Sequence, residues 1–393
     1  MRNKKYIIFV FLFFIVLVAS ACKTNNTIEN KSYNVNIDIN DINEAFIPAS
    51  EKAKEAVVGV SLYAKASIIQ SWHLSATGSG VIYKGTAYLK DGSSISVLET
   101  ADSNNVDYYE YYLLTNAHVV NSNESNKDIK IYLSRIDTLV SGSLVGINQY
   151  EDLAVVKFTT TIFITPLEFS NIPLRSGEIV LAVGNPLGYE YASTVTMGIV
   201  SNESRYIEVS RDLNGDDRDD WDGVVEVIQH DASINSGNSG GALVNIKGEL
   251  VGINAMKVTD KDETIEGIGF AIPLSIIKNV LDDMENGKPA KVNNLDKLVV
   301  YSVNDIINRD VLNLSRMPKI NLDNFSYTYG AYIFENNDNE YGLQPYDIVI
   351  KMNDIDIYNE GMFSALLRNY NGSKISWEVY RNGSIQVVEY NFD

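Results

Sequence analysis

The sequence predicts a mainly β fold, either a barrel or a sandwich. Two observations support this prediction, namely the short apolar runs and the turn residues that separate them. Between about residues 50 and 275, short runs of β-branched and aromatic residues follow one another, and Gly, Asn and Asp separate these runs at short intervals. The composition, with 45% hydrophobic and 21% charged residues, is that of a globular protein. The length of 393 residues predicts about two or three domains.

The expected strands are the apolar runs between these turn residues. The clearest runs lie at residues 57–62, 80–83, 129–133, 153–158 and 179–183. One helix is expected after them, with Ser275 as its N-cap and with Gly287 and Pro289 ending it. The apolar face of this helix comprises Ile276, Ile277, Val280, Leu281 and Met284.

A smaller unit follows the helix. The pair Asn293-Asn294 indicates a boundary, and residues 295–393 contain further short strands and a helix near residues 362–369. We therefore expect a second domain in the C-terminal quarter of the chain.

The N-terminal segment predicts export. Arg2, Lys4 and Lys5 precede an uninterrupted apolar stretch at residues 6–19, which is short for a membrane span and typical of a signal-peptide core. The small residues before Cys22 resemble the lipobox of bacterial lipoproteins, in which the cysteine is lipidated and becomes the mature N-terminus. The alternative is an ordinary signal peptide that happens to contain a cysteine.

The lipobox resemblance predicts a lipoprotein signal peptide at residues 1–21 and a lipid on Cys22. It implies an extracytoplasmic protein that is anchored to the cell membrane through this lipid. Residues 22–49 are mostly polar, with little apolar periodicity, which is typical of a flexible spacer between a lipid and a folded body.

Charge and cysteine count exclude two classes of function. The chain has 32 basic and 51 acidic residues, a formal net charge of −19, which repels phosphate backbones and excludes a nucleic-acid partner. Cys22 is the single cysteine, so the sequence contains neither an internal disulfide nor a multi-cysteine metal site.

Three short motifs supply the groups that serine proteolysis needs, namely a hydroxyl, an imidazole, a carboxylate and donors for an oxyanion. His118 follows an apolar run in Thr-Asn-Ala-His-Val-Val, and Asp152 begins Asp-Leu-Ala-Val-Val. Ser239 lies in Gly-Asn-Ser-Gly-Gly, whose glycines let the backbone bend so that consecutive N–H groups converge on one point.

Each motif alone has a structural interpretation. A lone histidine is usually a packing or surface residue, an aspartate often begins a strand, and a glycine-rich segment is often only a loop. The order His118, Asp152, Ser239 on an all-β background is that of chymotrypsin and differs from the orders in subtilisin and the α/β-hydrolases. The three motifs together therefore favour a catalytic triad.

Six motifs follow one another along the protease-like part of the chain. They are Thr-Gly-Ser-Gly-Val-Ile at 77–82, Thr-Asn-Ala-His-Val-Val at 115–120, Asp-Leu-Ala-Val at 152–155, Ala-Val-Gly-Asn-Pro at 182–186, Gly-Asn-Ser-Gly-Gly-Ala-Leu at 237–243 and Gly-Ile-Gly-Phe-Ala-Ile-Pro at 267–273. In this order they resemble the HtrA/DegP family of trypsin-like serine proteases. The resemblance implies a mainly β protein with a chymotrypsin-like double β-barrel at residues 50–292 and a small α+β PDZ domain at residues 293–393.

The resemblance also implies a mechanism. Ser239 attacks the peptide carbonyl, His118 acts as base and then as acid, and Asp152 fixes the imidazole tautomer. The backbone N–H groups of Gly237 and Ser239 form the oxyanion hole. This chemistry requires no metal and no organic cofactor.

Substrate specificity is expected to follow from the S1 pocket. In chymotrypsin-like enzymes the residue six positions before the nucleophile lies at the base of this pocket, and here that residue is Ser233. Ile268 makes the pocket apolar. We expect a preference for small or medium aliphatic side chains at P1.

The C-terminal unit resembles the PDZ domain of the family more loosely. Tyr329, Gly330, Ala331 and Tyr332 resemble its carboxylate-binding loop, and residues 342–349 resemble its Gly-Leu-x-x-x-Asp-x-Ile hairpin. The resemblance implies capture of peptide C-termini, degradation of unfolded or misfolded envelope proteins, and a homotrimer. The alternative function is a peptide-binding chaperone or stress sensor that uses the same scaffold with low turnover.

Two segments depart from the family pattern. A long insertion between Val81 and Leu114 predicts an elongated hairpin, used for assembly or regulation, or else a plain surface extension. An acidic loop at residues 212–222 places Asp212, Asn214, Asp216 and Asp220 at EF-hand-like spacing. Its twelfth position is a glycine instead of a bidentate glutamate, so a solvated loop and a weak Ca²⁺ site both remain open.

Overall fold

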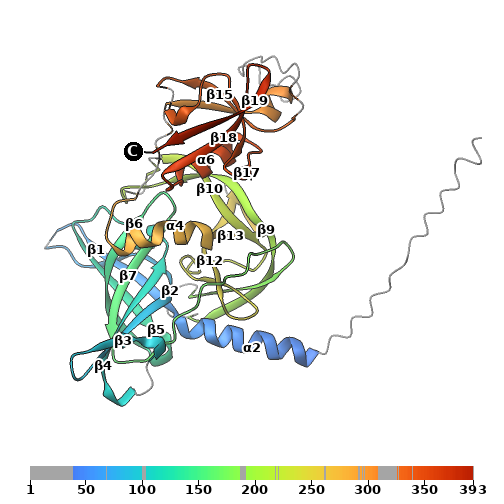
Figure 1. The fold of residues 1–393 in the computed structure, drawn as a ribbon. Coiled ribbons are helices and arrows are strands. Elements are labelled where there is room, and N and C mark those ends of the chain that lie inside the picture. The colour runs from blue at the N-terminus through green and yellow to red at the C-terminus, as the bar shows by residue number, and fades with distance from the viewer. Residues whose placement is uncertain are drawn as a thin grey trace, which may run out of the picture. The chain divides into compact units, whose positions relative to one another are not determined.

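The computed structural model describes most of the chain from residue 39 onward (Figure 1). The residues outside this description are 1–38, 68, 100–102, 186–191, 217, 220, 261–262, 291–292, 294, 296, 309–324, 326, 339 and 393. The predictions for the signal peptide, for Cys22 and for most of the spacer therefore lie outside the described residues. Of the helices within the description, none has the length and apolar character that crossing a bilayer requires.

Seven strands build the first sheet, and six of them close into a barrel. The strands are β1 (Val57–Lys65), β2 (His73–Leu89), β3 (Ser94–Ser96), β4 (Val106–Thr115), β5 (Asn126–Leu133), β6 (Thr138–Asn148) and β7 (Leu153–Thr160). Their order is β1-β5-β6-β7-β4-β2-β3, and β1 also pairs with β2, which closes six of them into a barrel. A short 3₁₀ turn (Ser134–Ile136) joins β5 to β6.

The insertion between β2 and β4 is an elongated hairpin, as predicted. The two strands stay paired from Val81 and Leu114 out to Leu89 and Val106. Two 3₁₀ turns, Val97–Glu99 and Ser103–Asn105, lie near its tip. The rings of Tyr88 and Tyr108 stack across the hairpin with centroids 4.7 Å apart.

Six strands close the second barrel (Figure 1). They are β8 (Ile179–Gly184), β9 (Thr194–Arg211), β10 (Trp221–His230), β11 (Ala242–Asn245), β12 (Leu250–Asp260) and β13 (Glu263–Pro273), and they pair in the order β10-β13-β12-β11-β8-β9. Each of the five runs that the sequence predicts as strands lies within a strand of one of the two barrels. The fold is thus mainly β, and the predicted double barrel is confirmed.

Helix α4 (Leu274–Glu285) packs against strands of both barrels. Ile276, Ile277 and Met284 on its predicted apolar face are buried in the main core. The predicted N-cap is wrong by two residues, because the helix begins directly after Pro273 and Ser275 lies inside its first turn. Proline fits this boundary because its fixed φ is compatible with the residue that enters a helix.

Helix α2 (Ile39–Ala56) occupies the last part of the segment predicted as a spacer. Ala49, Ala53 and Ala56 are buried in the main core, and Phe46 packs against it. These four positions recur every three or four residues, which is the period of an apolar helix face. The spacer prediction is therefore wrong for residues 39–49.

The C-terminal part is a separate sheet with one covering helix. Its strands are β14 (Leu298–Ser302), β15 (Ala331–Asn336), β16 (Ile348–Met352), β17 (Ile355–Asp356), β18 (Lys374–Arg381) and β19 (Ser384–Asn391), and the order is β14-β15-β16-β18-β19, with β17 on β16. The short helix α5 (Val303–Asn308), a 3₁₀ turn (Glu340–Gly342) and helix α6 (Glu360–Arg368) complete it. Residues 43–393 form one compact unit, in which α6 lies against β10.

Candidate active site

His118 lies just after the end of a strand of the first barrel. Strand β4 ends at Thr115, and the short helix α3 (Ala117–Val120) follows it directly. Ala117 and Val119 point into the protein and are buried, whereas the side chain of His118 is 52% exposed. The apolar neighbours therefore anchor the turn while the imidazole faces solvent.

Asp152 occupies the tight turn between β6 and β7 in a left-handed conformation, with φ of 55°. Its carbonyl accepts hydrogen bonds from Asn116 Nδ2 (2.9 Å) and from the N–H of Ala117 (3.1 Å). Its carboxylate faces His118, with Oδ2 2.9 Å from Nδ1 and Oδ1 accepting the His118 backbone N–H at 3.0 Å. This arrangement holds the imidazole by Nδ1 and leaves Nε2 for a reacting group.

The pair shifts the pKa of both partners. Desolvation by the surrounding protein lowers the pKa of His118, but the Asp152 carboxylate raises it more, so the net pKa is above its ordinary value. Burial alone would raise the pKa of Asp152, but the charges of His118 and Arg211 and the hydrogen bonds from His118 hold it below its ordinary value. Asp152 is therefore ionised and His118 is a strengthened base.

Arg211 is a third member of this cluster that the sequence motifs do not reveal. Its Nη1 lies 3.4 Å from Oδ2 of Asp152, and its side chain is 13% exposed. It is the last residue of β9 and directly precedes the acidic loop. The only sequence signal for it is a cation next to a run of carboxylates, which is ordinarily a surface feature.

A cleft of about 470 Å³ lies beside His118 and Asp152. Its walls include Arg211 and Asp212 from the start of the acidic loop and Asn123 from the segment after α3. The N–H of Asn123 donates to the carbonyl of Gly215 at 2.9 Å. The acidic loop is therefore attached to the segment that carries the histidine.

Ser239 lies in the loop between β10 and β11. Gly237, two residues before it, has a φ of 98° and is the third residue of a turn that the Asn238 N–H closes onto the Asn235 carbonyl at 2.9 Å. Such a turn favours glycine at this position, because a side chain there is strained. The turn explains why the motif requires Gly237.

The hydroxyl of Ser239 donates to the carbonyl of Ala255 at 3.1 Å. Within the described residues, no hydrogen bond joins this hydroxyl to His118. Catalytic hydrogen bonds are often absent until substrate binds. Attack on a carbonyl requires the hydroxyl to leave Ala255 and turn toward the imidazole.

The backbone donors around Ser239 divide into two kinds. The N–H of Asn238 is bonded within the turn, whereas the N–H groups of Gly237 and Ser239 donate to no acceptor among the described residues. These two are the donors predicted for the oxyanion hole. Both remain available for a developing negative charge.

The two predicted S1 residues lie in different surroundings. Ser233 is exposed, and its carbonyl accepts a hydrogen bond from Thr196 Oγ1 at 2.9 Å. Ile268 packs against a cluster that contains Val225, Val227 and Phe270. Both positions stay predictions for the specificity pocket.

The C-terminal sheet does not support the predicted peptide-binding residues. Ala331 and Tyr332 begin β15, which pairs with β14 on one side and β16 on the other, so a peptide strand has no free edge there. Tyr329 lines a pocket of about 460 Å³ together with Glu208, Asp305 and Glu360. These carboxylates disfavour a peptide C-terminus beside Tyr329, and the assignment of Tyr329, Gly330, Ala331 and Tyr332 as a carboxylate-binding loop stays a prediction.

The predicted Ca²⁺ loop stays a prediction. Asp212 Oδ1 accepts the N–H groups of Asn214 (3.1 Å) and Gly215 (2.6 Å), and Asn214 Oδ1 accepts the N–H of Asp216 at 2.9 Å. Asp220 lies outside the described residues. Within the described part of the chain, no group of three or more His, Cys, Asp or Glu residues could hold a metal ion.

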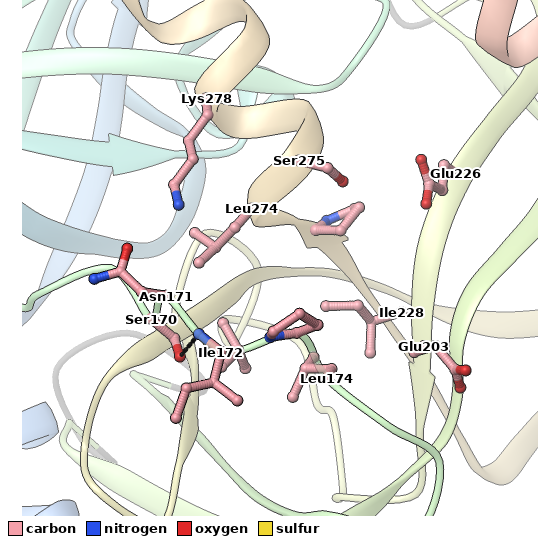
Figure 2. A pocket seen from close by; sticks show the side chains of 13 residues that line it. Ser170, Asn171, Ile172, Leu174, Glu203, Glu226, Ile228, Leu274, Ser275 and Lys278 are labelled. Atoms are coloured by element: carbon pink, nitrogen blue, oxygen red, sulfur yellow. Dashed lines mark hydrogen bonds between the residues drawn. The ribbon is translucent and has the colours of Figure 1, made fainter. Parts of the chain in front are cut away.

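A second cavity, of about 400 Å³, lies on the second barrel near the start of α4 (Figure 2). Figure 2 shows Glu203 and Glu226 on one side and Lys278 on the other. Ile228 and Leu174 are among its apolar lining residues. None of the predicted catalytic residues lines this cavity, so the chemistry belongs to the cleft beside His118.

Comparisons with known proteins agree with this geometry. The family model for the trypsin-like peptidase domain matches residues 78–253. "Serine protease Do-like HtrA" from Lactococcus lactis subsp. cremoris (strain MG1363) is 32% identical over 72% of this chain and 66% of its own length. The protein of the same name from Lactococcus lactis subsp. lactis (strain IL1403) is 31% identical over 80% of this chain and 70% of its own length.

Two further relatives extend the comparison. "Serine protease Do-like HtrB" from Bacillus subtilis (strain 168) is 31% identical over 70% of this chain and 58% of its own length. The solved structure "HtrA-type protease AlgW with decapeptide" has a TM-score of 0.55 and 23% identity, and the match covers 88% of this chain and 97% of that one. This chain thus spans about two thirds of the length of the Lactococcus relatives and less of the Bacillus protein.

Proposed function

The chain belongs to the HtrA family of trypsin-like serine endopeptidases, and from this premise we propose that it degrades unfolded or misfolded extracytoplasmic proteins. The observation that carries the proposal is the contact between His118 and Asp152, 2.9 Å from Nδ1 to Oδ2. It leaves Nε2 of an exposed imidazole on the side where a peptide bond can be presented.

The proposed mechanism assigns one role to each residue. Ser239 Oγ attacks the peptide carbonyl while Nε2 of His118 takes its proton, and the C–N bond breaks as His118 returns that proton to the leaving amine. Water then attacks the acyl-enzyme with His118 as base, and the acid product leaves. Asp152 keeps the proton on Nδ1 and stabilises the imidazolium, and the N–H groups of Gly237 and Ser239 bind the oxyanion.

We propose that peptides bind to the C-terminal sheet at β14. This strand is an edge among the described residues, since it pairs with β15 alone. Helix α6 contacts it, and a strand edge beside a helix is how PDZ domains accept an extended peptide. The solved AlgW structure is of a complex with a decapeptide, which makes an extended peptide a reasonable probe for this chain.

The full chain with Ser239→Ala gives the test for this edge. Anisotropy of a labelled peptide should show saturable binding, and an amidated C-terminus should weaken it if the carboxylate is recognised. Equal affinity for the free and amidated forms would contradict recognition of C-termini.

The test of the proteolytic function is labelling with a fluorophosphonate probe in the presence of an unfolded protein substrate. Wild type should label and cleave the substrate, and Ser239→Ala should do neither. Absence of Ser239-dependent labelling under these conditions would overturn the protease assignment and favour the chaperone or sensor.

Anchoring and assembly are proposals with separate tests. We propose lipidation of Cys22 on the basis of the residues before it, and a homotrimer on the basis of the family. Cys22→Ser should move the protein from the membrane fraction to the soluble fraction. Sedimentation of the soluble form as a monomer would contradict the trimer.

A further inference from the structure

Ser79 connects the nucleophile loop to two further motifs, those that contain Thr115 and Asn185. It lies in β2 and is fully buried. Its Oγ donates to the carbonyl of Gly237 at 2.7 Å, and its N–H donates to the carbonyl of Ser239 at 2.8 Å. One residue in the first barrel thus binds the backbone of both residues whose N–H groups are proposed to form the oxyanion hole.

The hydrogen bonds that Ser79 Oγ accepts fix the direction of its hydroxyl hydrogen. The N–H of Asn185 donates to Oγ at 2.8 Å, and Nδ2 of the same residue lies 3.4 Å away. The Ser79 carbonyl in turn accepts Thr115 Oγ1 at 2.7 Å, just before the histidine turn. Because donors from Asn185 occupy the oxygen's acceptor side, its own hydrogen is directed to Gly237.

The contact fixes a peptide plane at both edges. The plane between Gly237 and Asn238 carries the Gly237 carbonyl, held by Ser79 Oγ, and the Asn238 N–H, held by the Asn235 carbonyl. A plane held at both edges cannot rotate without losing two hydrogen bonds. The N–H groups of Gly237 and Ser239 lie on the peptide planes on either side, so their directions depend on this central plane.

Close packing makes the contact possible. A Cβ on Gly78 would lie 2.8 Å from the Ser239 carbonyl oxygen, and a Cβ on Gly240 would lie 2.1 Å from the Ser79 carbonyl oxygen. Real Cβ atoms do not approach that closely. The glycines on both sides of the contact therefore allow β2 to lie directly against the nucleophile loop.

We propose that Ser79 is a positioning residue for acyl transfer, which holds the Gly237–Asn238 peptide so that the N–H groups of Gly237 and Ser239 converge on the oxyanion. This inference rests on the proposed proteolytic function. It assigns a role to the hydroxyl of the Thr-Gly-Ser-Gly motif, and it differs from a packing role because the effect falls on the transition state.

The test compares Ser79→Ala with Ser61→Ala in the full chain. Removing one oxyanion donor costs about 10²–10³ in rate, and loosening two donors without removing them should lower kcat about 10–100-fold with KM within about twofold. Affinity for a peptide aldehyde, whose hemiacetal oxygen occupies the oxyanion position, should fall by a similar factor. Ser61 is a buried serine in β1 whose hydroxyl lies 3.4 Å from Oγ1 of Thr77, so its variant removes a buried hydroxyl of the neighbouring strand and should keep kcat and aldehyde affinity.

A second variant distinguishes a loss of catalysis from a folding defect. Ser79→Cys keeps an atom at the γ position with a weaker donor, so kcat and aldehyde affinity should fall together by a smaller factor. Unchanged kcat in a folded Ser79 variant would overturn the inference, as would a loss that appears only in melting temperature. A wild type without Ser239-dependent turnover would instead overturn the proposed function.

Discussion

Arg368 in helix α6 forms a buried ion pair with Glu151, the residue before Asp152. Nη2 of Arg368 lies 3.6 Å from Oε1 of Glu151, and the two side chains are 6% and 2% exposed. The guanidinium also stacks 4.7 Å from the ring centroid of Trp221 and donates to the carbonyl of Val224. The C-terminal helix therefore contacts the turn that positions the proposed triad carboxylate.

Replacing Arg368 should weaken both stability and catalysis. Arg368→Met leaves the Glu151 carboxylate buried without its cation, and breaking such a pair costs about 3–5 kcal/mol. We expect that loss in urea unfolding. Displacement of the Glu151–Asp152 turn should also slow Ser239-dependent labelling, on the order of tenfold.

The matched control is Arg381→Met. Arg381 makes a bidentate pair with buried Asp347 in the C-terminal sheet, at 2.6 Å for both contacts. Its loss should reduce stability without slowing the labelling of folded protein. Equal labelling rates in the two variants would show that the Arg368 contact does not reach the triad.

Removing the charge of Arg211 should move the pH profile. The positive charge of Arg211 lowers the pKa of His118, so Arg211→Gln should raise that pKa. Activity requires neutral His118, and the acid limb of kcat/KM should therefore shift to higher pH. The control is Arg175→Gln, since Arg175 is exposed and pairs only locally with Glu178 among the described residues. An acid limb that does not move would contradict the electrostatic contact.

His230 should make the protein acid-sensitive. The ring is fully buried, and neither nitrogen has a hydrogen-bond partner among the described residues. Desolvation lowers its pKa from 6.5 to about 4. Between these values the unfolded chain binds a proton that the folded chain does not, so stability falls as pH falls, by up to roughly 3 kcal/mol.

His230→Leu should remove this part of the pH dependence. The measurement is the free energy of unfolding in urea at neutral pH and at a pH between the two pKa values. The exposed His73 gives the control His73→Leu, which should keep the wild-type difference. If His230→Leu also keeps that difference, then His230 does not titrate with folding.

Cleavage specificity should be aliphatic. Ser233 offers no charge at the predicted base of the S1 pocket, so mass-spectrometric analysis of a peptide library should show small or medium aliphatic residues at P1. Ser233→Asp should add cleavage after Lys and Arg, because a carboxylate at this position selects basic side chains. Dominant cleavage after Lys or Arg by wild type would contradict the assignment of Ser233.

The sequence predicts the strands well because each is a local pattern. The runs at residues 57–62 and 153–158 are apolar and β-branched between turn residues, and both form strands. Closure of the barrels depends on pairings between distant strands, such as β10 with β13, which no local pattern contains. Helix α2 has a local signal in Phe46, Ala49, Ala53 and Ala56, which the polar composition of the segment obscures.

The residues of the active site also divide into those with a local sequence signal and those whose role depends on distant contacts. The motifs around His118, Asp152 and Ser239 identify residues whose chemistry is unusual for their setting. The local sequence does not indicate the roles of Arg211 and Ser79. Arg211 acts through Asp152, 59 positions away, and Ser79 acts through Gly237, 158 positions away. The free edge of the C-terminal sheet at β14 has no local signal either, because it depends on which strands pair with β15.

The hydrogen bond from Ser239 to the Ala255 carbonyl has a kinetic consequence. The nucleophile is turned to Ala255 in this structure, and attack requires a second rotamer that is turned to His118. The observed kcat is the intrinsic chemical rate multiplied by the fraction of time spent in the reactive rotamer. Any ligand that stabilises one rotamer over the other therefore sets the rate of the enzyme without contacting the imidazole or the carboxylate.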